Sequence, residues 1–130
     1  MDPWVAAVVW GVAVLLLAMT AITGRMRGKH GVMAPAVTGH PMFERAYRVQ
    51  MNTIEQAMMF LPAFLLAAHF GKTSLACIFG GIWILARVGY AITYLHNPRQ
   101  RGPAFILGML AFLALMAQSG WGILQHLLAA

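Results

Sequence analysis

Four long apolar runs alternate with short polar segments along the chain. The first run, from Trp4 to Ile22, contains no charged residue, and the segment from Gly28 to Pro41 carries repeated glycine and proline, which is typical of a loop. A helix that crosses a bilayer needs about 20 mostly apolar residues. The pattern predicts four transmembrane helices in one domain over residues 1–130, at about residues 4–24, 42–70, 75–96 and 104–128.

The composition supports the same architecture. Of the 130 residues, 61% are hydrophobic and only 9% are charged, whereas soluble domains carry about 25% charged residues. We therefore expect an all-α integral membrane protein, a four-helix bundle with almost no soluble part. The formal charge of +6 does not indicate nucleic-acid binding, because the basic residues lie at the ends of the apolar runs and form no basic stripe on a soluble helix.

The basic residues are distributed unevenly between the predicted loops. The second loop has only Lys72 and the termini have none, while the first and third loops with their flanks carry Arg25, Arg27, Lys29, Arg45, Arg48, Arg99 and Arg101. Because cytoplasmic loops carry the excess of Lys and Arg, these two loops are predicted to be cytoplasmic, with both termini on the opposite side. Short loops and the absence of targeting motifs favour a bacterial inner membrane.

Ionisable side chains inside a membrane span are costly and point to function. On the second predicted helix, Arg48, Asn52 and Glu55 are spaced i, i+4, i+7 and share one face, while Gln50 points roughly the opposite way. On the third helix, a second stripe at the same kind of spacing consists of Arg87, Tyr90 and Tyr94. The two stripes are the candidate functional surfaces.

Two hypotheses account for these residues. Arg87 could pair with Glu55 and simply tie two helices together. Alternatively, the surplus of arginine over acidic residues could be neutralised by an anionic ligand. Glutathione fits the second hypothesis: its carboxylates suit guanidinium groups, Glu55 could hold its ammonium group, and another cation would stabilise its thiolate, the nucleophilic form of a thiol whose pKa is ordinarily about 8.5.

Three motifs carry a resemblance to a known family. They are the segment Phe43–Glu55, which reads FERAYRVQMNTIE, the tetrapeptide Arg87–Tyr90 followed by Tyr94, and the segment Asn97–Phe105, which reads NPRQRGPAF. The first resembles the second-helix signature E-R-x-x-R-x-Q-x-N-x-x-E of the membrane-associated proteins in eicosanoid and glutathione metabolism, abbreviated MAPEG. The third is most similar to the microsomal glutathione transferase branch. The resemblance extends over nearly the whole chain.

The resemblance implies a site and an assembly. Arg101 would be the catalytic residue beside the glutathione sulfur, with Arg99 as its competitor, and motif position favours Arg101. Family members are homotrimers with the site between adjacent protomers. The residues that would bind glutathione as co-substrate are Arg27, Arg48, Gln50, Asn52, Glu55, Arg87, Tyr90 and Tyr94.

The sequence departs from the family pattern at two positions. Gln56 stands where the leukotriene-forming branch has a tyrosine, which favours the transferase branch. Pro98 removes a backbone donor near the end of the third helix, so a turn is expected to place Arg101. No metal is expected, because the histidines lack ligand spacing such as H-E-x-x-H.

Three classes of function remain open. The first is a membrane-bound glutathione transferase or peroxidase that conjugates lipophilic electrophiles or reduces lipid hydroperoxides, as in detoxification. The second is a non-catalytic, lipid-binding member of the same superfamily, which would be expected to lack the thiolate-promoting arginine. The third is a small four-helix transporter, which would be expected to carry an acid in its first helix. The sequence favours the enzyme and leaves its hydrophobic co-substrate open.

Overall fold

The computed structural model describes residues 1–130 and contains four long helices. They are α1 (Pro3–His30), α2 (Pro41–Phe70), α3 (Thr73–His96) and α4 (Gly102–Ala129), with a short 3-10 helix, η1 (Pro98–Gln100), before α4. All four are long and apolar enough to cross a membrane. The predicted all-α, four-helix class is therefore confirmed.

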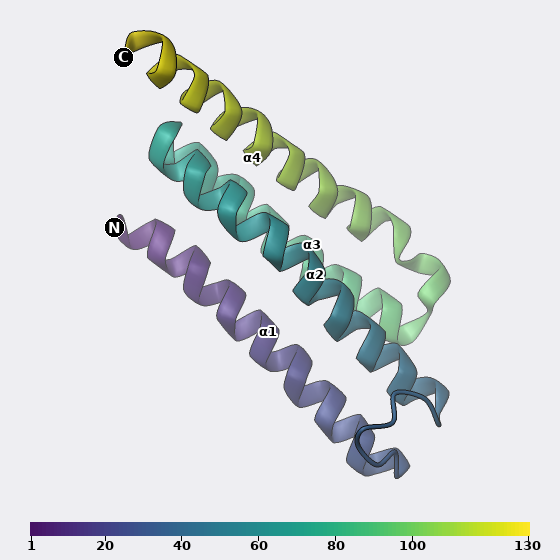
Figure 1. Cartoon of the computed structure of the whole chain (residues 1–130). Helices are drawn as coiled ribbons and strands as arrows, with labels where there is room; N and C mark the ends of the chain where they lie inside the picture. Colours follow the sequence, from purple (N-terminus) through teal and green to yellow (C-terminus); the bar gives the residue numbers. More distant parts are fainter.

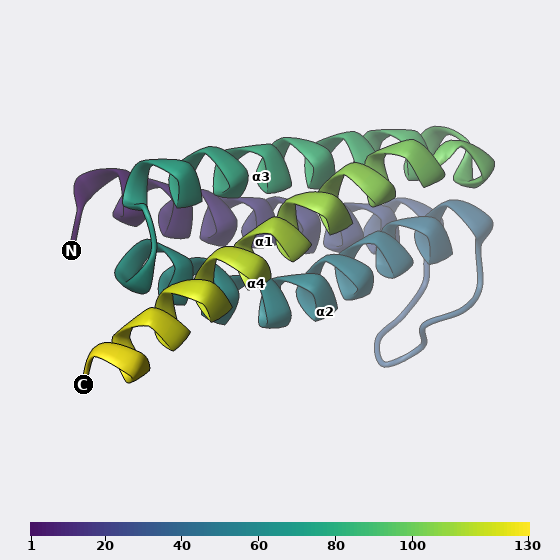
Figure 2. The ribbon, with the colours of Figure 1, turned by 90° about the horizontal axis from the view of Figure 1, so that it is seen from above.

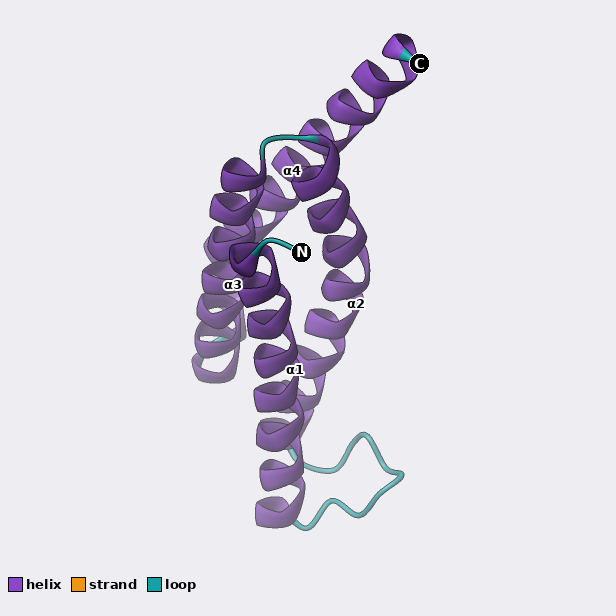
Figure 3. Cartoon of the chain, turned by 90° about the vertical axis from the view of Figure 1, so that its left-hand side faces the viewer, coloured by secondary structure: helices purple, strands orange, loops and turns teal.

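The helices α2 and α3 lie in the middle of the bundle, with α1 on one side and α4 on the other (Figure 1). Both termini lie at the end where the short turn joins α2 to α3, and the long loop after α1 lies at the other end, with η1 (Figure 1). The C-terminal turns of α4 diverge from the other three helices (Figures 2 and 3). This leaves the last turns of α4 exposed.

The first helix is longer than the hydrophobic run alone predicted. It continues past residue 24 to His30 and ends at Gly31, whose φ of 66° is left-handed and whose N–H donates to the carbonyl of Arg27. Arginine and lysine are good helix formers, so the basic segment extends the helix until a glycine can adopt the conformation that ends it. The basic side chains are thus held on a helix rather than in a loop.

Aromatic side chains fill the contact between α2 and α3. The rings of Phe60 and Trp83 stack with centroids 4.0 Å apart, and Phe64 stacks on Phe60 at 5.6 Å. Gly80 admits this cluster, because a Cβ there would lie 2.9 Å from both Phe64 and Val8. Helices in membranes associate through such close packing, since lipid chains are as apolar as the side chains themselves.

The fourth helix docks onto the α2–α3 turn through one small residue and one amide. The Nε2 of Gln118 donates to the carbonyls of Ala67 (3.3 Å) and Lys72 (2.8 Å). One turn further along, Gly122 lies directly against the Phe70 carbonyl, and a Cβ at this position would overlap that carbonyl. One turn further along, the ring of His126 packs edge to face against Phe70 with centroids 5.1 Å apart, so α4 contacts the end of α2 over two successive turns.

Replacing Gly122 with alanine is therefore expected to destabilise the bundle. The added methyl group must push α4 away from the end of α2, and overpacking of this kind costs about 1–3 kcal/mol. The measurement is the thermal unfolding midpoint of the purified protein in detergent, followed by circular dichroism. Gly120→Ala on the same helix is the matched control, because a Cβ there meets nothing within 4 Å. Equal midpoints for the two variants would contradict the close contact.

Candidate functional site

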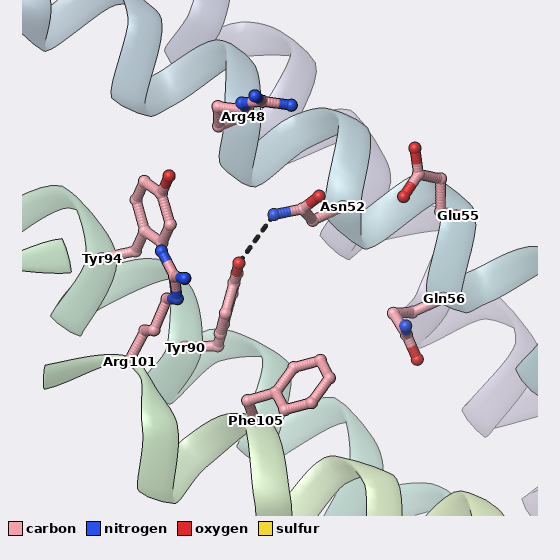
Figure 4. A pocket seen from close by; sticks show the side chains of 8 residues that line it. All are labelled: Arg48, Asn52, Glu55, Gln56, Tyr90, Tyr94, Arg101 and Phe105. Atoms are coloured by element: carbon pink, nitrogen blue, oxygen red, sulfur yellow. Dashed lines mark hydrogen bonds between the residues drawn. The ribbon is translucent and has the colours of Figure 1, made fainter. Parts of the chain in front are cut away.

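A cavity of about 440 Å³ lies between α2, α3 and the start of α4. It lies toward the end of the bundle that carries η1, because Arg101 follows that turn directly; the side chains that line it are drawn in Figure 4. Both predicted stripes contribute side chains to it. The lining residues are Arg48, Asn52, Glu55, Gln56, Tyr90, Tyr94, Arg101 and Phe105.

Helix α2 supplies one wall of the cavity. The predicted face forms as expected: Arg48, Asn52 and Glu55 follow one another along the helix and line the cavity, and Asn52 points toward Tyr90 (Figure 4). Arg48 and Glu55 are exposed, while Asn52 is half-buried. The residues on the other side of the same helix, such as Val49 and Thr53, are buried in the bundle, which fixes the polar stripe toward the cavity.

Helix α3 supplies the opposite wall. Tyr90 is 3% exposed, and its hydroxyl accepts a hydrogen bond from Nδ2 of Asn52 at 2.8 Å. This bond joins the two walls (Figure 4). Tyr94 lies one turn further along, with its ring centroid 5.6 Å from that of Tyr90. The tyrosines thus give the cavity an aromatic wall that carries hydroxyl groups.

Arg101 reaches the cavity from the link between α3 and α4. Pro98 begins η1, Asn97 caps it by accepting from the backbone N–H of Arg99 (3.1 Å), and Arg101 precedes the first turn of α4. A turn rather than a continuous helix therefore places Arg101, as the proline predicted. Its guanidinium carbon lies 5.5 Å from the centroid of the Tyr94 ring. Arg99 is exposed and does not line the cavity.

The charges around the cavity favour an anion. Two guanidinium groups, of Arg48 and Arg101, face one carboxylate, of Glu55. Guanidinium groups bind carboxylates through charge-assisted hydrogen bonds, and a carboxylate binds an ammonium group in the same way. No three His, Cys, Asp or Glu side chains are gathered so that they could hold a metal ion. The arrangement suits a ligand with more than one negative group and a single positive one.

Arg87 lies behind the cavity rather than in its wall. It is 2% exposed, its Nη2 donates to Thr53 Oγ1 at 3.0 Å, and its guanidinium carbon lies 4.1 Å from the centroid of the Tyr90 ring. The bond to Thr53 takes the place of the ion pair with Glu55 that was considered from the sequence. Arg87 Nε has no hydrogen-bond partner. The buried guanidinium is thus next to the cavity and separated from it by the Tyr90 ring.

Arg27 and Gln50 lie on the α1 side of the chain, away from the cavity. Arg27 Nη1 donates to the carbonyls of Ala36 (2.7 Å) and Val32 (3.3 Å) in the loop after α1. Gln50 Nε2 donates to Thr20 Oγ1 on α1 at 3.1 Å. Within one chain, then, the structure brings together six of the nine predicted site residues and leaves Arg27, Gln50 and Arg87 outside the wall.

Two lining residues had no role assigned from the sequence. Gln56 is four residues after Asn52, and Phe105 is four residues after Arg101. Side chains at i and i+4 on a helix share a face, so extending the stripe of the second predicted helix by one turn would have found Gln56. Phe105 lies on α4, which carries neither predicted stripe. The Phe105 ring lies 6.3 Å from that of Tyr90 and makes one end of the cavity apolar.

Known proteins are similar to this chain over most of its length. An uncharacterised protein of Synechocystis is 39% identical over 124 residues, covering 95% of this chain and 90% of that protein. Microsomal glutathione S-transferase 2 of Homo sapiens is 34% identical over 99 residues, covering 75% of this chain and 67% of the relative. Leukotriene C4 synthase of Bos taurus is 33% identical over 99 residues, covering 76% and 66% respectively.

A family model agrees with these similarities. The model of the MAPEG family matches residues 5–121, which contain α2 and α3, most of α1 and α4, and every residue that lines the cavity. The resemblance found in the motifs of α2 and α3 is thereby confirmed. The chain belongs to the MAPEG family.

Proposed function

We propose that this protein is a glutathione-dependent membrane enzyme that holds the tripeptide as a thiolate. The observation that carries the proposal is the composition of the cavity: two arginines, one glutamate, an amide and two tyrosines converge in a member of the MAPEG family. Two relatives bear the names of a glutathione S-transferase and of leukotriene C4 synthase. The motif of α2 supports the same ligand.

Each group in the cavity has a counterpart on glutathione. Arg48 is suited to bind a carboxylate, and Glu55 is suited to accept hydrogen bonds from the ammonium group. Asn52 and the hydroxyls of Tyr90 and Tyr94 can bind the peptide groups. Arg101 lies at the opposite side of the cavity from Glu55 (Figure 4), where its charge favours the thiolate over the thiol.

The chemistry needs only the thiolate and a lipophilic partner. In conjugation, the thiol proton passes to water, the sulfur attacks an electrophilic carbon, and a carbon–sulfur bond forms as a leaving group departs or a proton adds to the product. In peroxide reduction, two thiols are oxidised to one disulfide while a lipid hydroperoxide is reduced to an alcohol and water. The apolar ring of Phe105 is 39% exposed, which suits contact with a lipophilic partner that arrives from the bilayer.

We extend this proposal to a homotrimer in which the loop after α1 and the link between α3 and α4 are cytoplasmic. Arg48 and Glu55 are exposed on a membrane-spanning helix, and a charged side chain in the hydrocarbon costs about 2.5–3.5 kcal/mol. A second copy would cover them. Arg27 and Gln50 lie on the α1 side of the chain, so in a closed ring they would face the cavity of a neighbouring copy. The non-catalytic alternative is disfavoured, because Arg101 is present and lines the cavity.

Replacing Arg101 with alanine is expected to reduce strongly the fraction of bound glutathione that is present as thiolate. Loss of a nearby cation raises the pKa of a thiol by about one unit or more, so the thiolate fraction at neutral pH should fall at least about tenfold. The measurement is ultraviolet thiolate absorbance during titration of the detergent-solubilised protein with glutathione. Arg99→Ala is the matched control, since Arg99 carries the same charge outside the cavity. If the native protein gives no saturable thiolate signal, the proposed function is wrong.

Replacing Glu55 with glutamine is expected to weaken glutathione binding. A hydrogen bond between charged groups contributes about 1.5–3 kcal/mol, which corresponds to roughly a 10- to 100-fold increase in Kd. Calorimetric titration with glutathione and with an analogue lacking its amino group tests the contact directly. The native protein should bind the analogue weakly, and Glu55→Gln should cause no further loss.

Glu44→Gln serves as the control for Glu55, because Glu44 lies at the start of α2 and accepts from the Gly39 N–H. It should bind both ligands as the native protein does. An equal loss of affinity for glutathione and for the analogue in Glu55→Gln would show that Glu55 does not hold the ammonium group.

A further inference from the structure

A second hollow lies on the other side of α3, between α1 and α3, and we call it the α1–α3 groove. Its volume is about 480 Å³, and its twelve lining residues are hydrophobic except for Gly11. It shares no residue with the cavity that holds Arg101. Ala18 and Ile22 line it from α1, and Val88 and Leu95 line it from α3.

The groove closes at one end and approaches a charged surface at the other. At the closed end α1 and α3 approach closely, since a Cβ on Gly11 would lie 3.1 Å from the Ile84 Cδ1. From Gly11 to Ile22 the groove follows α1 for eleven residues, about 17 Å at 1.5 Å per residue. This is close to half of the roughly 30 Å hydrocarbon thickness of a bilayer, the depth of one lipid acyl chain.

Two basic residues continue the groove-lining face of α1 beyond its open end. Arg25 follows Ile22 by three residues and Ala18 by seven, and Lys29 follows Ile22 by seven and Arg25 by four. These spacings place all four on one face of the helix. Both basic side chains are exposed and neither takes part in a hydrogen bond or salt bridge, whereas Arg27 is bound to the loop carbonyls on another face.

No carboxylate of the chain is available to neutralise Arg25 and Lys29. The chain has three acidic residues. Asp2 caps the far end of α1, Glu44 accepts from Gly39, and Glu55 lines the cavity. A second copy of the chain would therefore bring an apolar surface to the groove but no partner for its two cations. A phospholipid with an anionic headgroup supplies both an apolar acyl chain for the groove and a negative charge for the two cations.

We infer that the α1–α3 groove binds one anionic glycerophospholipid. One acyl chain lies between Ala18 and Val88 and ends against Gly11, and the phosphate is held by Arg25 and Lys29. The inference does not depend on glutathione, since the groove and the cavity have no residue in common. It assigns these two basic residues a ligand of defined chemistry, beyond their contribution to topology.

Native mass spectrometry of the delipidated protein tests the inference. It is titrated with phosphatidylglycerol and with phosphatidylcholine of identical acyl chains. One phosphatidylglycerol per chain should bind with clear preference over phosphatidylcholine. A basic residue close to an anionic headgroup strengthens binding about fivefold, so the double variant Arg25→Gln, Lys29→Gln should lose roughly 30-fold in affinity for phosphatidylglycerol and little for phosphatidylcholine.

Two further variants separate the headgroup site from the groove. Lys72→Gln removes one charge at the opposite end of the bundle and should bind phosphatidylglycerol as the native protein does. Ala18→Trp fills the groove and should weaken the binding of both lipids, and circular dichroism verifies that the variant is folded. Equal affinity of the native protein for the two lipids, or unchanged binding by the double variant, would overturn the inference. So would an Ala18→Trp protein that binds lipid normally but changes its oligomeric state, because the groove would then be a contact between copies.

Discussion

The cost of placing charge in a membrane is the constraint on which this structure depends. In hydrocarbon, every backbone polar group must be paired within the protein, and 92 of the 101 backbone hydrogen bonds lie within helices. Side-chain charges must likewise face a partner, a water-filled space or the interface. Arg48 and Glu55 meet this constraint in part by lining the polar cavity between α2, α3 and the start of α4, although both side chains remain exposed in the single chain.

Small residues let the helices of the bundle pack closely. Gly80 and Gly122 let the helices approach where their side chains would otherwise collide, and alanines such as Ala63 and Ala67 are almost fully buried between α2 and its neighbours. At the other end of the bundle, toward η1, the cavity lies between α2, α3 and the start of α4. There, the longer side chains of Tyr94 and Arg101 reach into the space between them (Figure 4).

The sequence predicts the fold well, because a membrane imposes simple rules on length and polarity. It predicts four helices and the shared face of Arg48, Asn52 and Glu55, since both follow from local periodicity. It does not predict that α1 continues to His30, because hydropathy falls at Arg25 while helix propensity does not. The end of α1 is set by the backbone conformation of Gly31.

The site is less predictable from the sequence, because its walls come from three helices. Periodicity places Arg87, Tyr90 and Tyr94 on one stripe of α3, but the side chains of one stripe differ in direction around the helix axis. The packing of α2 turns Arg87 inward to Thr53 and leaves Tyr94 at the cavity. Likewise, only the contact between α1 and α2 decides that Gln50 bonds to Thr20. These outcomes depend on which helices are neighbours, which no local pattern contains.

Arg87 shows how this arrangement can favour an anion without a buried ion pair. Its charge is held by one neutral hydroxyl and the face of the Tyr90 ring, and neither cancels it. Charges in a medium of low dielectric constant are weakly screened, so this cation adds to the potential of Arg48 and Arg101 across the cavity wall. An ion pair with Glu55 would have cancelled both charges. By bonding to Thr53, Arg87 leaves Glu55 available for a ligand and keeps the cavity positive.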